Sequence, residues 1–209
     1  TFIEKGSSAV SIRGGVSSEN NFMYTGTIGA SLNGKYDFEV KSNYGTLFYN
    51  YDELYSNESS QLYLSGIATW WFVRKHILPD LEVNLGLKGG YERSDYNKFS
   101  YMIQDTVRID YMNYYAAKIG ISSSMNVKLT DKWFFQPFYT IYFDLGKDTY
   151  YRDNELINFI NYGESSYLGF SLFHRNNKGN VFHVTFKEYM STYSSLTNYS
   201  VVFGYVIVL

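Results

Sequence analysis

Histidine is the side chain best suited to moving protons near neutral pH, and this chain of 209 residues contains three histidines. An esterase or deacylase would need one of them beside a serine or an acidic residue, oriented for proton abstraction. Ser171 and His174 are close in sequence, but residues three apart on a β-strand point to opposite faces. In the β-barrel that the strand pattern predicts below, Ser171 would face inward and His174 outward. His183 is expected to face inward at the start of the next strand, and His76 falls in a predicted turn. We therefore expect no shared catalytic site and no enzyme activity.

Two groups of acidic residues could offer oxygen ligands to Ca²⁺ or Mg²⁺. Neither group has the spacing of a defined calcium loop, so we interpret both as solvated loop carboxylates. The chain has no cysteine, which removes disulfides, iron-sulfur clusters and thiol catalysis. No metal and no cofactor is therefore expected. The two groups are Asp52, Glu53 and Glu58, and Asp148, Asp153 and Glu155.

Nearly the whole chain alternates between apolar and polar or small residues, which is typical of β-strands with one apolar face. The clearest segments are residues 81–91 and 115–129, and no segment has a sustained helical period. The sequence therefore predicts an all-β fold. Turn signals divide it into ten expected strands at 9–17, 22–33, 35–49, 60–73, 81–92, 109–129, 133–146, 165–175, 181–191 and 197–209.

The expected connections alternate between short turns and longer polar stretches. Short turns are predicted at Asn33-Gly34, a preferred hairpin dipeptide, and at 74–80, 130–132 and 176–180. Longer stretches lie between them at 51–59, 93–108 and 147–164. Long strands with this asymmetry are typical of a transmembrane antiparallel up-and-down β-barrel. Ten strands would place both termini in the periplasm, with residues 1–8 as a periplasmic segment of one domain, 1–209.

Charge and hydropathy agree with this interpretation. The formal charge of −2 gives no reason to expect nucleic acid as a partner. No stretch approaches the roughly 18 apolar residues of a membrane helix, but half of each barrel strand faces a polar lumen and dilutes the signal. The opening residues TFIEKGSS lack the basic start and apolar run of a signal peptide, so the numbering is expected to begin in the mature protein.

The last strand carries a more specific pattern. Gly204, two residues, Ile207, one residue and Leu209 resemble the C-terminal targeting signal of bacterial outer-membrane β-barrels, which the barrel assembly machinery recognises. Val202 and Leu209 depart from that signal, because they replace its usual polar residue and its terminal aromatic. The resemblance implies the outer membrane as location, its lipid and lipopolysaccharide as surroundings, and the assembly machinery as a partner during biogenesis. The residues assigned to the signal are Phe203, Gly204, Tyr205, Ile207 and Leu209.

Aromatic residues make up 20% of the chain, and they gather at two levels. Amphipathic rings favour the boundary between lipid and water, so we interpret these levels as the two aromatic girdles of a barrel. The girdle residues are Trp70, Trp71, Trp133 and Phe134 near the expected periplasmic turns, and Tyr44, Tyr49, Tyr111 and Tyr115 near the other end.

The expected inward face carries six cations and five carboxylates. A ten-stranded barrel is narrow, so these charges would pair across the lumen and fill it. Inward glycines would leave space for the long side chains. The predicted lumen charge network consists of Arg13, Asp37, Glu39, Lys41, Glu82, Lys88, Glu92, Lys118, Lys128, Asp144 and Lys187.

The favoured function is a non-enzymatic outer-membrane barrel with a narrow, charge-plugged lumen. It would act as a structural or anchor protein of the envelope, or as an accessory subunit of a larger outer-membrane complex. The first alternative is a narrow channel for ions or small solutes, and the second is an enzyme acting on lipid or peptide. A protease of the omptin type is disfavoured, because no histidine lies at the expected extracellular end. A soluble β-sandwich is the alternative for the fold.

Overall fold

The computed structural model describes residues 6–19, 21–50, 56–103, 105–152, 155–191 and 194–209. This described part forms ten β-strands, the number that the turn signals predict. None of its segments is a helix long and apolar enough to cross a membrane. The strands are β1 (Ala9–Glu19), β2 (Asn21–Leu32), β3 (Tyr36–Asn50), β4 (Ser56–Leu78), β5 (Leu81–Ile103), β6 (Asp105–Lys128), β7 (Trp133–Arg152), β8 (Glu155–Arg175), β9 (Val181–Ser191) and β10 (Ser194–Val208).

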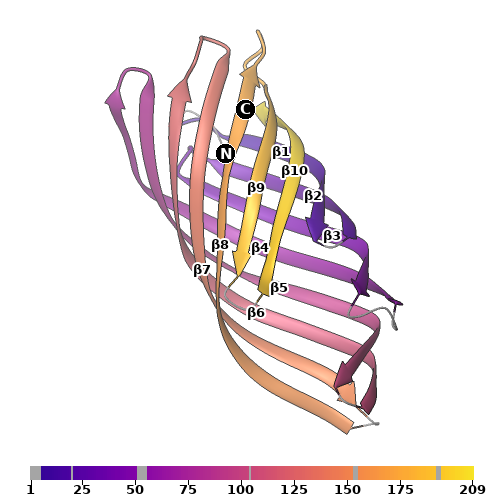
Figure 1. Ribbon diagram of the computed structural model, residues 1–209. Helices are drawn as coiled ribbons and strands as arrows, with labels where there is room; N and C mark the ends of the chain where they lie inside the picture. Colours follow the sequence, from indigo (N-terminus) through magenta and orange to yellow (C-terminus); the bar gives the residue numbers. More distant parts are fainter. Residues whose placement is uncertain (1–5, 20, 51–55, 104, 153–154, 192–193) are drawn as a thin grey trace.

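The ten strands form one closed antiparallel barrel (Figure 1). Each strand pairs with its neighbour in sequence, and β1 pairs with β10 to close the sheet. Ile12 lies opposite Tyr205, and Val16 lies opposite Val201. The backbone of Leu209 also donates a hydrogen bond to the carbonyl of Ser8, at 2.8 Å. Closure between the first and last strands gives every strand two hydrogen-bonded neighbours, as a sheet in lipid requires.

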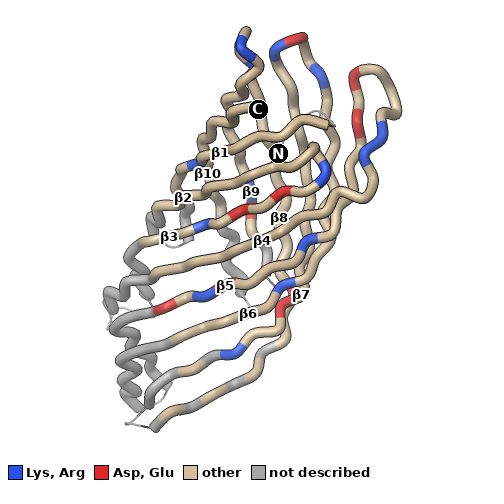
Figure 2. Tube along the Cα trace, turned by 180° about the vertical axis from the view of Figure 1, so that it is seen from behind, with Lys and Arg blue, Asp and Glu red and all other residues tan. Residues whose placement is uncertain are grey.

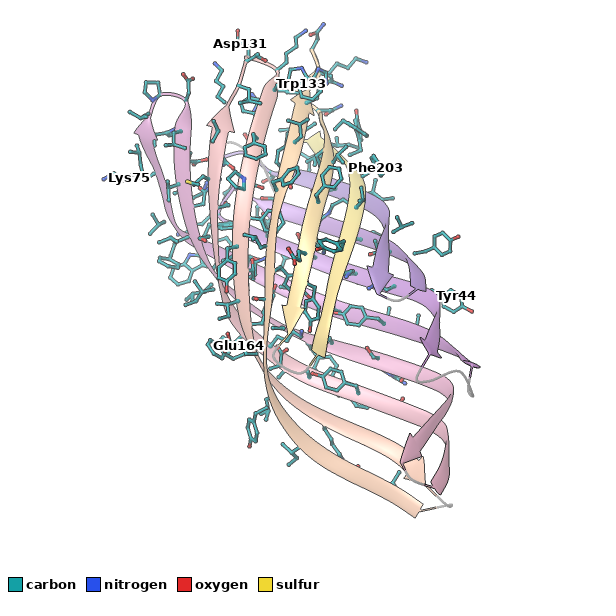
Figure 3. All side chains as sticks on the ribbon, in the orientation of Figure 1. Tyr44, Lys75, Asp131, Trp133, Glu164 and Phe203 are labelled. Atoms are coloured by element: carbon teal, nitrogen blue, oxygen red, sulfur yellow. The ribbon has the colours of Figure 1, made fainter. Side chains whose placement is uncertain are left out.

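The barrel is polar inside and apolar outside. Among the described residues, 21 polar or charged side chains are buried and eight apolar ones are buried. In the core of a soluble protein the apolar side chains would be the majority. Outward side chains such as Ile28 and Ile119 are 64% and 65% exposed. Tyr44 and Lys75 likewise point away from the sheet (Figure 3). Closure and a polar interior rule out the soluble β-sandwich.

An apolar band runs around the outer surface. On β7 the outward side chains are apolar or aromatic from Trp133 to Leu145, and the next outward residue is Lys147. The run of uncharged outward residues likewise ends at Arg93 on β5 and at Glu164 on β8. From Glu164 to His174 is eleven residues, which matches the roughly 9 to 11 that a tilted strand needs to cross the hydrocarbon. Charged groups thus bound the band where a lipid face would end.

The strands differ greatly in length. Strands β4 to β8 have 20 to 24 residues, whereas β1, β2, β3, β9 and β10 have 11 to 15. The parts of β4 to β8 beyond the level of Arg93, Lys147 and Glu164 extend past the other strands on one side of the barrel, toward the lower right of Figure 1. We call this extension the tall wall.

The prediction of long loops at 93–108 and 147–164 is wrong, because most of these residues belong to the strands of the tall wall. In the structure β5 and β6 pair as far as Ile103 with Asp105, and β7 and β8 pair as far as Arg152 with Glu155. These segments are polar, but they are rich in Tyr, Phe, Ile and Thr, which favour strands. Polar composition in these segments marks the end of the apolar outer band. It does not mark the end of the strands, which continue to pair beyond that band.

Both termini lie at one end of the barrel, which we call the terminal end (Figure 1). The turns β2–β3, β4–β5, β6–β7 and β8–β9 lie there as well. Asn33 and Gly34 have φ values of 53° and 57°, the left-handed conformation of a tight hairpin turn that the dipeptide predicts. The opposite end, formed by the other hairpins, is the hairpin end. The assignment of the terminal end to the periplasm stays a prediction.

Candidate functional site in the barrel lumen

The lumen holds the main concentration of functional groups. Ten of the eleven charges that parity predicts for the inside do face the lumen. Figure 2 shows how charged residues are distributed along the strands. Between them lies a cavity of about 190 Å³. Its charged lining residues among those described are Arg13, Glu39, Lys41, Lys88, Lys118 and Lys187.

Lys118 forms a buried ion triad with two carboxylates on the wall of the lumen. The Lys118 Nζ lies 2.9 Å from Glu92 Oε2 and 3.4 Å from Asp144 Oδ2. The three side chains are 5%, 6% and 10% exposed, so these charges have little contact with solvent. Tyr63 donates a hydrogen bond to the same Glu92 oxygen at 2.6 Å, and Ser165 donates to Asp144 Oδ2 at 3.0 Å. One lysine thereby links side chains from the five consecutive strands β4 to β8.

The other cavity cations contact tyrosine rings or a single carboxylate. Arg13 Nη2 lies 2.7 Å from Glu39 Oε1. Lys118 and Lys88 both lie over the ring of Tyr142, at 5.4 and 5.9 Å from its centroid. The quadrupole of an aromatic ring attracts a cation, most strongly where water is excluded. Two further pairs have the same geometry, Lys187 with Tyr167 at 5.4 Å and Lys41 with Tyr63 at 5.2 Å.

A second polar cluster lies closer to the terminal end. Arg74 binds Glu82 through two nitrogens, at 3.1 and 3.2 Å, and donates to the backbone carbonyl of Gly34. Asn126 donates to Glu82 at 2.7 Å and accepts a hydrogen bond from Gln136 at 2.6 Å. Bidentate pairing and satisfied amides make this a rigid arrangement.

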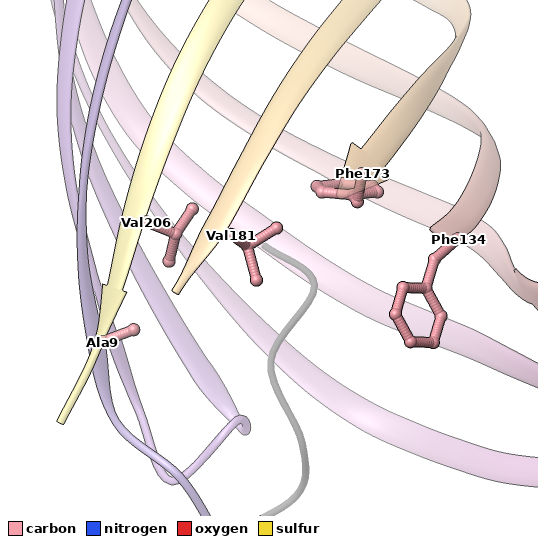
Figure 4. Close-up of a cluster of buried hydrophobic side chains, with 5 residues drawn as sticks. All are labelled: Ala9, Phe134, Phe173, Val181 and Val206. Atoms are coloured by element: carbon pink, nitrogen blue, oxygen red, sulfur yellow. The ribbon is translucent and has the colours of Figure 1, made fainter. Parts of the chain in front are cut away.

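An apolar cluster lies in the lumen where β7, β8, β9, β10 and β1 approach the terminal end (Figure 4). Its members are Ala9, Phe134, Phe173, Val181 and Val206. Inward apolar residues exclude water here and occupy space that polar side chains fill elsewhere in the lumen. Charged, polar and apolar side chains thus each line a different part of the lumen.

One predicted lumen charge lies elsewhere. Lys128 is the last residue of β6, and its side chain is 41% exposed. It lies 2.7 Å from Asp131 in the following turn, and this hydrogen bond holds the pKa of the Asp131 carboxyl below its ordinary value. Although Lys128 has inward parity, it lies at the rim, beyond the level at which other strands enclose the lumen. The prediction of Lys128 in the lumen network is therefore wrong.

The structure places the predicted girdle residues on both faces of the sheet. Trp70 and Trp133 face outward, at 44% and 42% exposed. Trp71 faces the lumen and donates to Asp37 Oδ2 at 2.8 Å. Phe134 belongs to the inner apolar cluster. Consecutive residues on a strand point to opposite faces, so adjacent aromatics could not both face lipid.

At the other level, Tyr44 is exposed on the outer face, as predicted, and Tyr115 lies beside the outward Tyr91 with ring centroids 6.3 Å apart. The side chains of Tyr49 and Tyr111 lie outside those that the structure describes.

Sequence reasoning missed several lumen residues. Parity alone would have found Tyr63, Tyr142 and Tyr167, which alternate in step with predicted inward residues. It would not have found Arg74. A β-bulge between Trp71 and Val73 inserts one residue, and this turns Arg74 from the outer face to the lumen.

In the described part of the chain, no histidine bonds a serine hydroxyl or a carboxylate directly. His174 faces outward against Trp133, with ring centroids 4.7 Å apart. Ser171 and His183 both face inward, as predicted, but each contacts Thr185 Oγ1, at 2.7 and 3.2 Å. A threonine hydroxyl thus stands between the serine and the imidazole. The described residues also include no group of three or more His, Asp or Glu that could hold a metal ion.

The closing strand has the alternation expected of the assembly signal. Phe203, Tyr205, Ile207 and Leu209 are between 39% and 78% exposed on the outer face. Gly204 faces inward, where a Cβ atom would collide with the imidazole of His183 and with Arg13. Packing in the lumen therefore favours glycine at this position, independently of any role in the assembly signal. Recognition of the strand by the assembly machinery stays a prediction.

Replacing Lys118 with methionine tests the ion triad. The change leaves Glu92 and Asp144 buried without their cation, and removing one partner of a buried pair costs about 3 kcal/mol or more. We expect Lys118→Met to lower the free energy of unfolding by that amount, measured by urea titration in lipid vesicles. The control Lys132→Met, in the exposed β6–β7 turn, should change it by about 0.5 kcal/mol or less. Equal stabilities of the two variants would contradict the triad.

No family model and no curated protein matches this sequence. Among solved structures, the fold is similar to the translocator domain of the autotransporter NalP from Neisseria meningitidis, with a TM-score of 0.53 and 10% identity over 98% of this chain and 89% of that one. It is also similar to the β-domain of the Bordetella autotransporter BrkA, with a TM-score of 0.50 and 11% identity over 97% and 99% of the two chains. Identities this low show the fold alone. The chain has the fold of a small bacterial outer-membrane β-barrel.

Proposed function

We propose that this protein is a non-enzymatic barrel of the bacterial outer membrane that serves the envelope as a structural element. The observation that carries the proposal is the buried triad of Lys118, Glu92 and Asp144, with Tyr63 and Ser165 bound to its carboxylates. These groups come from five strands and occupy the middle of a narrow lumen. A barrel built to pass solutes would keep this space open to water.

The absence of enzyme activity is part of the same proposal. Hydrolysis by serine needs an imidazole that takes the hydroxyl proton directly. In this lumen the hydroxyl of Thr185 lies between Ser171 and His183. His174 is on the lipid-facing side and contacts a tryptophan. Neither arrangement provides a nucleophile with a bound base.

The lumen still contains a cavity of about 190 Å³, and this favours a narrow channel as the second candidate function. Planar-bilayer recording separates the two. We expect the purified protein to show no regular conductance steps, because the triad and the apolar cluster fill the bore. The double variant Lys118→Ala/Glu92→Ala should open it and produce steps, whereas Lys132→Ala should stay silent. Regular steps from the unchanged protein would overturn the plugged barrel and favour the channel.

A second observation supports a role as an accessory subunit. Strand β8 pairs with β7 along its whole length, but with β9 only from Ser165 onward. The segment from Glu155 to Glu164 therefore has one hydrogen-bonding edge without a described partner strand. It lies in the tall wall, where Ile160 is paired with Lys147 and is 68% exposed. Free edges recruit strands from other proteins.

Photocrosslinking tests this edge as a contact for a protein partner. A photoreactive residue replacing Ile160 should give a crosslinked product of higher mass in native membranes. The matched control replaces Ile119, which is 65% exposed in the apolar band and should contact lipid only. If Ile160 gives no more product than Ile119, the accessory-subunit role is contradicted, and a free-standing structural role remains.

A further inference from the structure

The charges of the lumen balance overall but not at the cavity. Among the described residues, five cationic side chains and one carboxylate line the cavity. The remaining inward carboxylates lie outside the lining, around Lys118 on one wall and with Arg74 and Trp71 nearer the terminal end. The cavity lining therefore carries an excess of cations, while Glu92 and Asp144, which offset Lys118, lie directly behind that lining.

Two of these cations already have carboxylate partners. Arg13 binds Glu39 at 2.7 Å, and Lys118 binds both Glu92 and Asp144. Lys88 and Lys187 differ from them. Each contacts a tyrosine ring, that of Tyr142 or Tyr167, and Lys88 also hydrogen-bonds the Tyr142 side chain. Neither makes an ion pair with a carboxylate in the described part of the chain.

Tyrosine rings do not complete the coordination of these ammonium groups. A ring stabilises a cation by about 0.5 to 2 kcal/mol and accepts no full charge, whereas burying an unpaired ammonium costs several kcal/mol. Each ammonium has three donors to satisfy. A bound anion would supply both the missing charge and the missing acceptors.

We infer that the lumen cavity is a binding site for a small oxyanion, of the phosphate or carboxylate class. Lys88 and Lys187 would bind its oxygens, and Lys41, which lines the same cavity over Tyr63, would add positive potential. Ser122 and Thr140 offer hydroxyls on the cavity wall, where they lie 2.8 Å apart. Hydroxyls beside cations are common partners of phosphate and carboxylate oxygens.

The site goes beyond the structural role and does not depend on it. An anion held between Lys88 and Lys187 would add contacts between the β5 and β9 sides of the lumen, and so brace it internally. The barrel could be closed to conduction whether or not the site is occupied. Conductance and anion binding can therefore fail separately.

Isothermal titration calorimetry with inorganic phosphate tests the inference. The protein is purified in a zwitterionic detergent and titrated at constant ionic strength, with acetate and sulfate in separate titrations to define the oxyanion class. We expect saturable binding of phosphate with one site per barrel. Loss of a charge-assisted hydrogen bond should weaken it, so Lys88→Met and Lys187→Met should each raise the Kd about ten-fold or more.

Two further variants separate binding from folding. Lys178→Met removes an exposed cation in the β8–β9 turn and should leave the Kd unchanged. Lys187→Arg keeps the charge and should retain binding if Lys187→Met does not fold, as judged by heat-modifiable gel mobility. The absence of saturable binding of phosphate, acetate and sulfate alike by the unchanged protein would overturn the site. So would a Kd that is the same in folded Lys88→Met or Lys187→Met as in Lys178→Met.

Discussion

The backbone hydrogen bonds of a chain in lipid have no water to replace a missing partner, and the rest of this structure depends on that constraint. An open sheet would leave two unpaired edges in the hydrocarbon. Pairing of β1 with β10, from Ala9 with Val208 to Ser18 with Tyr199, removes both. Once the sheet is closed, strict alternation sends every second side chain to lipid and the others to a confined lumen. The outer band and the inner polar network are two consequences of one pairing.

Closure of only ten strands makes the lumen narrow, and this decides what the inward residues can do. Long charged side chains from different strands are brought close together there, so they bind one another. Lys118 is the clearest case, because a single ammonium satisfies two carboxylates from β5 and β7. The same confinement leaves Lys88 and Lys187 against tyrosine rings, and the cavity between them carries the excess positive charge. The proposed filling of the bore and the proposed affinity for an anion thus have the same physical origin.

Parity explains both what the sequence could predict and what it could not. Period-two alternation predicted ten strands, their closure and ten of eleven lumen charges, because a strand in a closed barrel has only two faces. The prediction failed where a β-bulge changes which face a residue occupies, and where a residue lies past the end of the lumen. The bulge beside Trp71 turned Arg74 inward without a signal in the residue types. Lys128 kept its parity but lay past the end of the enclosed lumen. Polar composition indicated where the chain leaves the membrane, yet pairing of β5 with β6 and of β7 with β8 continued into the tall wall.

The most direct test of the account is the accessibility of alternate residues to lipid, and the chain has no native cysteine to interfere. Single cysteines at Ile119 and Ile121 on the outer face, and at Ser122 and Ser124 on the inner face of the same strand, would carry a fluorophore in reconstituted vesicles. Lipids with nitroxide groups in their acyl chains should quench the label at the first two positions strongly and at the second two weakly. Quenching that does not alternate along β6, or that is absent at all four positions, would contradict a closed barrel with one face in lipid and a filled polar lumen.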